Sequence, residues 1–166
     1  MIVVSDTTPL NYLVLINAVD VLPKLFQEVY VTTAVLGELM HAKAPETVCR
    51  WAQSPPAWLR VEDPLSLLPS TARLGPGEAA AISLAKERHI ATVLIDERRG
   101  TNVARREGLF PLPTLAIIEL AAERDILPIR SAIEKLQATN IRISRELVAA
   151  ALDRDAKRKI AGNRPT

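Results

Sequence analysis

The stretch Ile2-Val3-Val4-Ser5-Asp6-Thr7-Thr8-Pro9 opens the chain and decides how we interpret the rest of it. Its short apolar run is typical of a buried strand, and Thr8-Pro9 is typical of a helix start. Asp6 should therefore lie where a strand passes into a helix. A second stretch, Ala91 to Ile95, has the same form and ends in Asp96. Because open α/β sheets bind ligands at the carboxyl ends of their strands, both aspartates are candidates for one site.

Segments of strand length alternate along the chain with segments of helical character. The expected strands are residues 2–5, 28–31, 58–61, 92–95 and 109–112. The expected helices are residues 10–16, 19–26, 34–43, 47–53, 78–88, 100–107, 114–123, 128–138 and 145–159. Strands separated throughout by helices favour parallel pairing. We therefore predict an α/β protein with a three-layer α/β/α fold and a central parallel sheet of four to five strands.

Length and charge suggest how the chain is divided. Its 166 residues are 48% hydrophobic but only 4% aromatic, which predicts one core built from Leu, Ile, Val and Ala. We predict a single domain over residues 1–152 and a basic C-terminal tail over residues 153–166, which continues the last helix and then becomes disordered. The tail has five basic and two acidic residues, a net charge of +3, so residues 1–152 carry −1 of the total +2. Such a tail could contact phosphates or could simply be a solvated terminus.

Other features of the composition bear on localisation. No apolar run approaches the length of a membrane span, and no secretion signal is apparent. The single cysteine, Cys49, cannot form an internal disulfide. We therefore expect a cytoplasmic protein that does not enter a membrane.

Four carboxylates stand out because their surroundings are apolar or tightly structured: Asp6, Glu38, Glu78 and Asp96. Each has a structural alternative. Asp6 could cap a helix, Glu38 could face solvent, and Glu78 suits the first turn of a helix. Asp96 could pair with a nearby arginine. If the four gathered at one sheet edge, they would raise one another's pKa, and a divalent cation would relieve that repulsion.

Oxygen ligands alone favour Mg²⁺ or Mn²⁺ over zinc, and Cys49, His41 and His89 lack the spacing of zinc ligands. Carboxylate-held cations of this kind activate water for attack on a phosphodiester. The chain has no motif typical of a serine hydrolase or of a nucleotide-binding P-loop. An aspartyl-phosphate enzyme would need a second aspartate where Thr8 stands and a lysine after residues 109–112, and neither is present. A non-catalytic binding or regulatory module stays open as an alternative.

The acidic motifs, taken in order, resemble those of the PIN-domain family. They are Val4-Ser-Asp-Thr-Thr-Pro-Leu10, Val31-Thr-Thr-Ala-Val-Leu-Gly-Glu-Leu39, Leu74-Gly-Pro-Gly-Glu-Ala-Ala-Ala-Ile82 and Leu94-Ile-Asp-Glu-Arg-Arg-Gly100. They are most similar to a prokaryotic branch, related to VapC-like endoribonuclease toxins, that has Gly-x-Gly-Glu-Ala and Ile-Asp-Glu-Arg motifs. The resemblance runs from Ile2 to about Leu152.

This resemblance implies a parallel sheet between helices and a Mg²⁺- or Mn²⁺-dependent endoribonuclease that acts on RNA. In many members the domain is the toxin of a toxin–antitoxin pair and forms a homodimer, which makes a protein antitoxin a candidate partner. The resemblance assigns the catalytic and metal-binding acids to Asp6, Glu38, Glu78 and Asp96. It places a hydroxyl beside the first acid, at Thr7.

The fourth motif departs from the family pattern. Asp96-Glu97-Arg98-Arg99 replaces an ending similar to Asp-x-Asp-Phe, and Glu97 could add a ligand or pair with an arginine. The third acid, Glu78, stands where the common toxin branch has Asp. By analogy and by charge, four arginines border the acidic edge and could hold RNA phosphates or could instead solvate an exposed helix: Arg98, Arg99, Arg105 and Arg106.

The last expected helix carries an apolar side. It consists of Leu147, Val148, Ala151 and Leu152, which could pack on the core or form the seam of a dimer. We favour core packing for most of this side.

Overall fold

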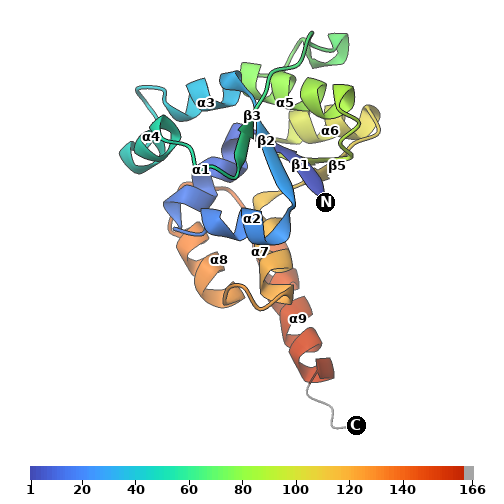
Figure 1. The fold of residues 1–166 in the computed structure, drawn as a ribbon. Coiled ribbons are helices and arrows are strands. Elements are labelled where there is room, and N and C mark those ends of the chain that lie inside the picture. Colours follow the sequence, from blue (N-terminus) through green and yellow to red (C-terminus); the bar gives the residue numbers. More distant parts are fainter. Residues whose placement is uncertain (163–166) are drawn as a thin grey trace. The chain divides into compact units, whose positions relative to one another are not determined.

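The computed structural model describes residues 1–162 and contains one five-stranded sheet in which every neighbouring pair of strands is parallel (Figure 1). The strands are β1 (Ile2–Ser5), β2 (Glu28–Val31), β3 (Leu59–Val61), β4 (Thr92–Leu94) and β5 (Phe110–Leu112). Helices flank this sheet, so the predicted three-layer α/β/α fold with a parallel sheet is confirmed. Both edge strands are short, and β5 contains Pro111, a residue that sheets tolerate at an edge.

The described chain forms two compact units, which meet between Thr114 and Leu115. The first unit contains the sheet and the helical segments α1 (Thr7–Leu15), η1 (Val19–Val21), α2 (Leu22–Leu25), α3 (Thr33–Leu39), α4 (Glu46–Gln53), η2 (Pro69–Thr71), α5 (Pro76–Glu87) and α6 (Arg98–Arg106). The second unit contains α7 (Thr114–Glu123) from its second residue on, α8 (Ile129–Gln137) and α9 (Arg145–Gly162). No helix within residues 1–162 is both long enough and apolar enough to cross a membrane.

The order of the strands, β3-β2-β1-β4-β5, positions the candidate site. From β1 the chain moves outward to β2 and β3, then returns past β1 to β4 and continues in the opposite direction to β5. The winding direction therefore reverses between β1 and β4, and such a reversal opens a crevice at the carboxyl ends of the two strands. Asp6 directly follows β1, and its N–H donates to the carbonyl of Leu94, the last residue of β4, at 2.9 Å. Asp96 lies two residues beyond Leu94, so both aspartates flank this crevice.

The core of the first unit forms where the central strands meet α5. Val4 and Val93 are fully buried, and α5 contacts both β1 and β4. Nearly the whole of α5 is buried, as its run of alanines predicts, because small side chains let the helix approach the sheet closely. This packing fixes the start of α5, and with it Glu78, at the crevice.

One helix is shorter than the sequence indicated. We expected a helix over residues 34–43, but α3 ends at Leu39. Beyond it the N–H of His41 donates to the carbonyl of Glu38 and the N–H of Ala44 donates to that of His41. Each of these bonds spans three residues instead of four, so the chain tightens into turns ahead of Pro45.

Four basic residues of α9 form polar contacts within the second unit. Arg154 forms a salt bridge with Glu119 at 2.7 Å, and Lys157 pairs with Asp153 at 2.7 Å. Arg158 donates to the carbonyl of Ala122, near the end of α7, at 2.9 Å. This end of α7 leaves carbonyl groups without helical partners, so Arg158 acts as a cap.

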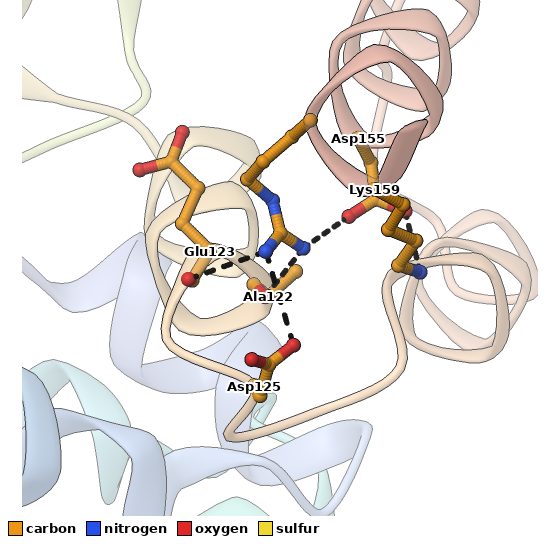
Figure 2. Close-up of polar contacts among 6 residues, drawn as sticks. Ala122, Glu123, Asp125, Asp155 and Lys159 are labelled. Carbon is orange, nitrogen blue, oxygen red and sulfur yellow. Dashed lines mark hydrogen bonds and ion pairs between the residues drawn. The ribbon is translucent and has the colours of Figure 1, made fainter. Parts of the chain in front are cut away.

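Figure 2 shows the acidic partner of this cap. Asp155 accepts a hydrogen bond from Arg158 at 2.7 Å and forms a salt bridge with Lys159 at 2.7 Å. Asp125 also lies 3.8 Å from the guanidinium of Arg158. The interpretation of α9 as a phosphate-binding tail therefore competes with a structural role for its cations.

The proposed division into a domain at residues 1–152 and a tail at 153–166 stays a prediction. α9 runs without interruption through residue 152, while residues 163–166, where we expected disorder, lie outside the described chain. On the apolar side of α9, Val148 and Ala151 are buried, whereas Leu147 is exposed.

Candidate active site

Asp6 is the most deeply buried acid at the sheet edge, with 1% of its surface exposed. It occupies the N-cap position of α1 but makes no side-chain capping hydrogen bond, and its buried Oδ1 has no hydrogen-bond partner. Burial raises the pKa of Asp6 from 3.8 to about 7; the negative charges of Glu78 and Glu38 add to this shift, and the backbone N–H groups of Thr7 and Thr8 oppose it. The start of α1 therefore acts on this carboxylate through the N–H groups of Thr7 and Thr8 but leaves its Oδ1 without a partner.

Glu38 is held in place by groups from two other segments. The backbone N–H of Gly77 donates to its Oε1 at 2.8 Å, and the hydroxyl of Thr7 donates to its Oε2. A Cβ atom at position 77 would lie 2.5 Å from Glu38 Oε2, so only glycine leaves room for the carboxylate. Glu38 thus lies at the sheet edge, and the hydroxyl predicted at Thr7 is bonded to it.

Glu78 lies in the first turn of α5, where it accepts a hydrogen bond from the N–H of Gly75, the N-cap residue, at 3.3 Å. Its other oxygen, Oε1, is buried and has no hydrogen-bond partner. A Cβ atom at Gly100 would collide with this oxygen, so a second glycine makes room for a carboxylate. Burial raises the pKa of Glu78, the N–H groups of Gly75 and Gly100 oppose the shift, and the charges of Glu97 and Glu38 add to it.

Asp96 differs from the other acids because both of its carboxylate oxygens accept hydrogen bonds from one residue. Its Oδ1 accepts a hydrogen bond from the N–H of Thr114 at 2.9 Å and its Oδ2 accepts one from the Thr114 hydroxyl at 2.6 Å. Burial raises the pKa of Asp96, the bonds from Thr114 oppose the shift, and the charge of Glu97 adds to it. Asp63, two residues beyond β3, binds Thr33 in the same way, at 2.8 and 2.7 Å. Asp96 therefore has a structural role at a strand end in addition to any role in the site.

The acids form a connected electrostatic group. The negative charges of Glu38 and Glu78 help to raise the pKa of Asp6. The charge of the exposed Glu97 helps to raise the pKa of Glu78 and of Asp96. Over residues 1–162 no salt bridge joins any of these acids to a lysine or arginine, so the expected alternative in which Asp96 pairs with an arginine is not observed. The group is therefore negative and uncompensated.

The acids do not form a complete metal centre. In the described part of the chain, no three Asp, Glu, His or Cys side chains are placed so that together they could hold an ion. Glu38 points its oxygens at Thr7 and Gly77, and Asp96 points its oxygens at Thr114. Asp6 and Glu78 nevertheless each keep a buried carboxylate oxygen without a donor. Two such oxygens in a group of acids fit a hard divalent cation, which takes oxygen ligands and neutralises the repulsion.

Two clefts open near the acids. One has a volume of about 510 Å³ and is lined by Glu38 together with Asn11, Gly37, His41 and Lys43, among others. The other has a volume of about 500 Å³ and lies between the segment around η2 and helix α6. Both clefts lie within the first unit and offer space for a substrate.

The four arginines predicted to contact RNA are all exposed on α6. Arg99 and Arg106 line the second cleft, and Arg73 joins them from the segment before α5; Arg98 and Arg105 are not among its lining residues. Sequence reasoning did not select Arg73. The one indication in the sequence is that Arg73 lies two residues before the Gly75-Pro-Gly turn that leads to Glu78.

Parallel α/β sheets commonly bind ligands at their switch point, and carboxylates there favour a cation. A protein-family model described as PIN domain matches residues 2–157, which is nearly the whole chain. The chain therefore belongs to the PIN-domain family. PIN domains are generally nucleases that hydrolyse RNA or DNA and typically use divalent metal ions. No curated protein and no solved structure matched the chain in the corresponding searches.

Proposed function

We propose that this protein is a Mg²⁺- or Mn²⁺-dependent endoribonuclease, with Asp6, Glu38, Glu78 and Asp96 as its catalytic and metal-binding acids. The observation that supports this most strongly is the pair of buried carboxylate oxygens, Asp6 Oδ1 and Glu78 Oε1, that have no hydrogen-bond partner. Burying an unpaired carboxylate costs several kcal/mol in the low dielectric of a protein interior, or makes the group take up a proton, and a bound cation would relieve that cost.

A bound divalent cation supplies the Lewis acidity that activates water and stabilises charge in phosphodiester hydrolysis. The chain's own contribution is to position the acids. Asp6 and Glu78 offer free oxygens, Glu38 is oriented by Thr7 and Gly77, and Asp96 is oriented by Thr114. The exposed Glu97 is a candidate further ligand, and the cleft beside Glu38 gives the substrate access.

The biological setting belongs to the same proposal. We propose a cytoplasmic homodimer that acts as the toxin of a toxin–antitoxin pair, with a separate protein as its antitoxin. The support is the similarity of the acidic motifs to the toxin branch, together with Leu147, which α9 exposes to 56% of its full area. Glu78 and the Asp96-Glu97-Arg98-Arg99 ending set this chain apart from the common toxin pattern.

A second candidate function is that of a non-catalytic binding module on the same fold. The observation that favours it is the engagement of Asp96, because both of its oxygens already accept hydrogen bonds from Thr114. Asp63, which is not among the proposed metal-binding acids, makes the same two bonds to Thr33.

The deciding experiment measures cleavage of a mixed-sequence RNA with Mn²⁺, with Mg²⁺ and with EDTA, for the wild type and Asp6→Asn. We expect cleavage only with metal and only for the wild type. Asp20→Asn is the matched control, because Asp20 is an exposed aspartate that is not among the charges that shift the pKa of Asp6, Glu78 or Asp96. Metal-independent cleavage, or full cleavage by Asp6→Asn, would overturn the proposal. Mn²⁺ binding without cleavage would favour the binding module.

A further inference from the structure

The cleft between η2 and α6 has arginines on both of its walls. Residues 69–74 form one wall and contribute Arg73, while α6 forms the other and contributes Arg99, Asn102, Val103 and Arg106. The volume of about 500 Å³ is large enough for part of an extended ligand. Among residues 1–162, no acidic side chain lines it.

The charge of this cleft is uncompensated. Three other arginines of the first unit have carboxylate partners: Arg50 pairs with Glu46, Arg60 with Glu28 and Arg88 with Glu62. Arg98 and Arg105, which lie on α6 outside the cleft, form no salt bridge with residues 1–162. The three cleft arginines are exposed and form no salt bridge with any residue from 1 to 162. Three like charges around one concave surface attract an anionic ligand and focus its approach.

Both walls of the cleft lead directly to the acidic group. On one wall Arg73 and Leu74 are followed by Gly75, whose N–H donates to Glu78. On the other wall Arg99 is followed by Gly100, which packs against the same carboxylate. An extended ligand that occupies the cleft would therefore lie close to Glu78.

We propose that this cleft binds the phosphodiester backbone of a single-stranded nucleic acid next to the bond that is cut. The proposal rests on the nuclease function proposed above and narrows its binding surface to Arg73, Arg99 and Arg106. Guanidinium groups bind phosphate oxygens through two parallel hydrogen bonds. Arg99 and Arg106 are seven residues apart, about 10 Å along the helix axis, so they reach different phosphates of one strand.

The test compares two double variants that remove the same charge from the same helix. In the Asp6→Asn background with EDTA, we measure the anisotropy of a fluorescein-labelled oligouridine at increasing NaCl concentration. We expect Arg99→Ala/Arg106→Ala to weaken binding about tenfold and to lower the slope of log K against log salt by about 1 to 2. Arg98→Ala/Arg105→Ala should stay within about twofold of the parent protein.

Arg73→Ala tests the opposite wall, which α6 does not form. We expect it to weaken binding roughly threefold to tenfold alone and to add to the loss from Arg99→Ala, because the two guanidiniums contact the same strand. Equal losses in the two α6 double variants, or no loss from Arg73→Ala, would overturn the proposal. Melting temperatures of all variants confirm that these exposed substitutions leave the fold intact.

The oligonucleotides also identify the strand. Oligodeoxyuridine is measured beside oligouridine, and a cleft-dependent loss with either one supports the phosphate site and shows which nucleic acid occupies it. Because binding is measured without metal and without turnover, absence of cleavage by the wild type would refute the nuclease function but leave this result standing. Metal-dependent cleavage that Arg99→Ala/Arg106→Ala does not change would overturn the cleft alone.

Discussion

Charged side chains are arranged in opposite ways in the two units of this protein. At the sheet edge of the first unit, Asp6 and Glu78 each bury a carboxylate oxygen with no donor, and no salt bridge of the described residues reaches them. On α9 in the second unit, the cations face acids, as Asp155 shows by binding both Arg158 and Lys159 (Figure 2). Salt-bridge partners are present in one region and absent from the other, although Nε of Arg158 on α9 is also buried without a hydrogen-bond partner.

The difference separates charge that supports function from charge that supports stability. Unpaired buried charge destabilises a fold and is retained where a ligand or a reaction uses it. Paired charges on the surface contribute little to the free energy of unfolding and need no ligand to balance them. We therefore expect substitutions at the sheet edge to change activity strongly and stability in a favourable direction, whereas substitutions on α9 should change stability alone.

The largest expected effect comes from Asp6→Asn. We expect RNA cleavage to fall by at least about 100-fold, since even residues that only orient metal ligands contribute 10- to 100-fold. The same substitution should raise the stability of the metal-free protein at neutral pH, because it removes a buried charge. Cleavage assays measure the loss of activity, and thermal melts measure the gain in stability. A loss of both activity and stability would mean that Asp6 is structural and would break the comparison.

The second expected effect is a pH dependence of the metal-free protein. The pKa of Asp6 is raised from 3.8 to about 7, so between these values the folded protein holds a proton that the unfolded chain has released. Stability is therefore lost as pH rises from about 4 to about 7, by up to about 4 kcal/mol. Burial raises the pKa of Glu78 and Asp96 as well, so their contributions have the same sign.

Urea unfolding in EDTA across this pH range measures the effect, and Asp6→Asn should show a smaller dependence. A saturating divalent cation should reverse the trend, because it favours the ionised carboxylates of the folded state. Stability that rises with pH in the metal-free protein would contradict the assignment.

A smaller effect is expected from Arg158→Ala. This substitution leaves the carbonyl of Ala122 without its donor and removes a partner of Asp155, so the melting temperature should fall by a few degrees. RNA cleavage per folded molecule should not change. Reduced RNA binding by Arg158→Ala would restore the interpretation of α9 as a phosphate-binding tail.

The smallest effect is expected from Lys157→Ala. Lys157 and Asp153 form an exposed pair one helical turn apart, with 74% and 57% of their side chains exposed. Such pairs contribute almost nothing in water, so the melting temperature should stay within about 1 °C of the wild type. If Lys157→Ala lowered the melting temperature as much as Arg158→Ala, solvent exposure would not explain which salt bridges of α9 contribute to stability.

Local sequence predicted much of the fold and part of the site. Apolar runs that end in Asp6 and Asp96 located two strand ends, and the run of alanines after Gly77 predicted the buried helix α5, because these patterns lie within single elements. The helix expected over residues 34–43 was too long, since hydrophobic spacing does not reveal where backbone bonds tighten into turns.

The partners of the site residues could not be predicted in this way. Thr114 contributes two hydrogen bonds to Asp96 from beyond β5, and Arg73 reaches the cleft from a segment that the sequence marked only as a connection. The α9 cations drew attention as a basic run, although their acidic partners on α7 and α9 neutralise them. Each case depends on segments brought together by packing.

By itself, the sequence determined the alternation of strands and helices, the acids that end strands, and the resemblance to the PIN-domain family, because these follow from residues close together in the chain. Only the tertiary structure decided that β1 and β4 lie side by side, that Glu38 is bound by Thr7 and Gly77, 31 and 39 residues away, and that Arg99 and Arg106 line the cleft whereas Arg98 and Arg105 do not. The physical reason is that hydrophobic periodicity is local, whereas a hydrogen bond or a cleft depends on which distant surfaces the core brings into contact.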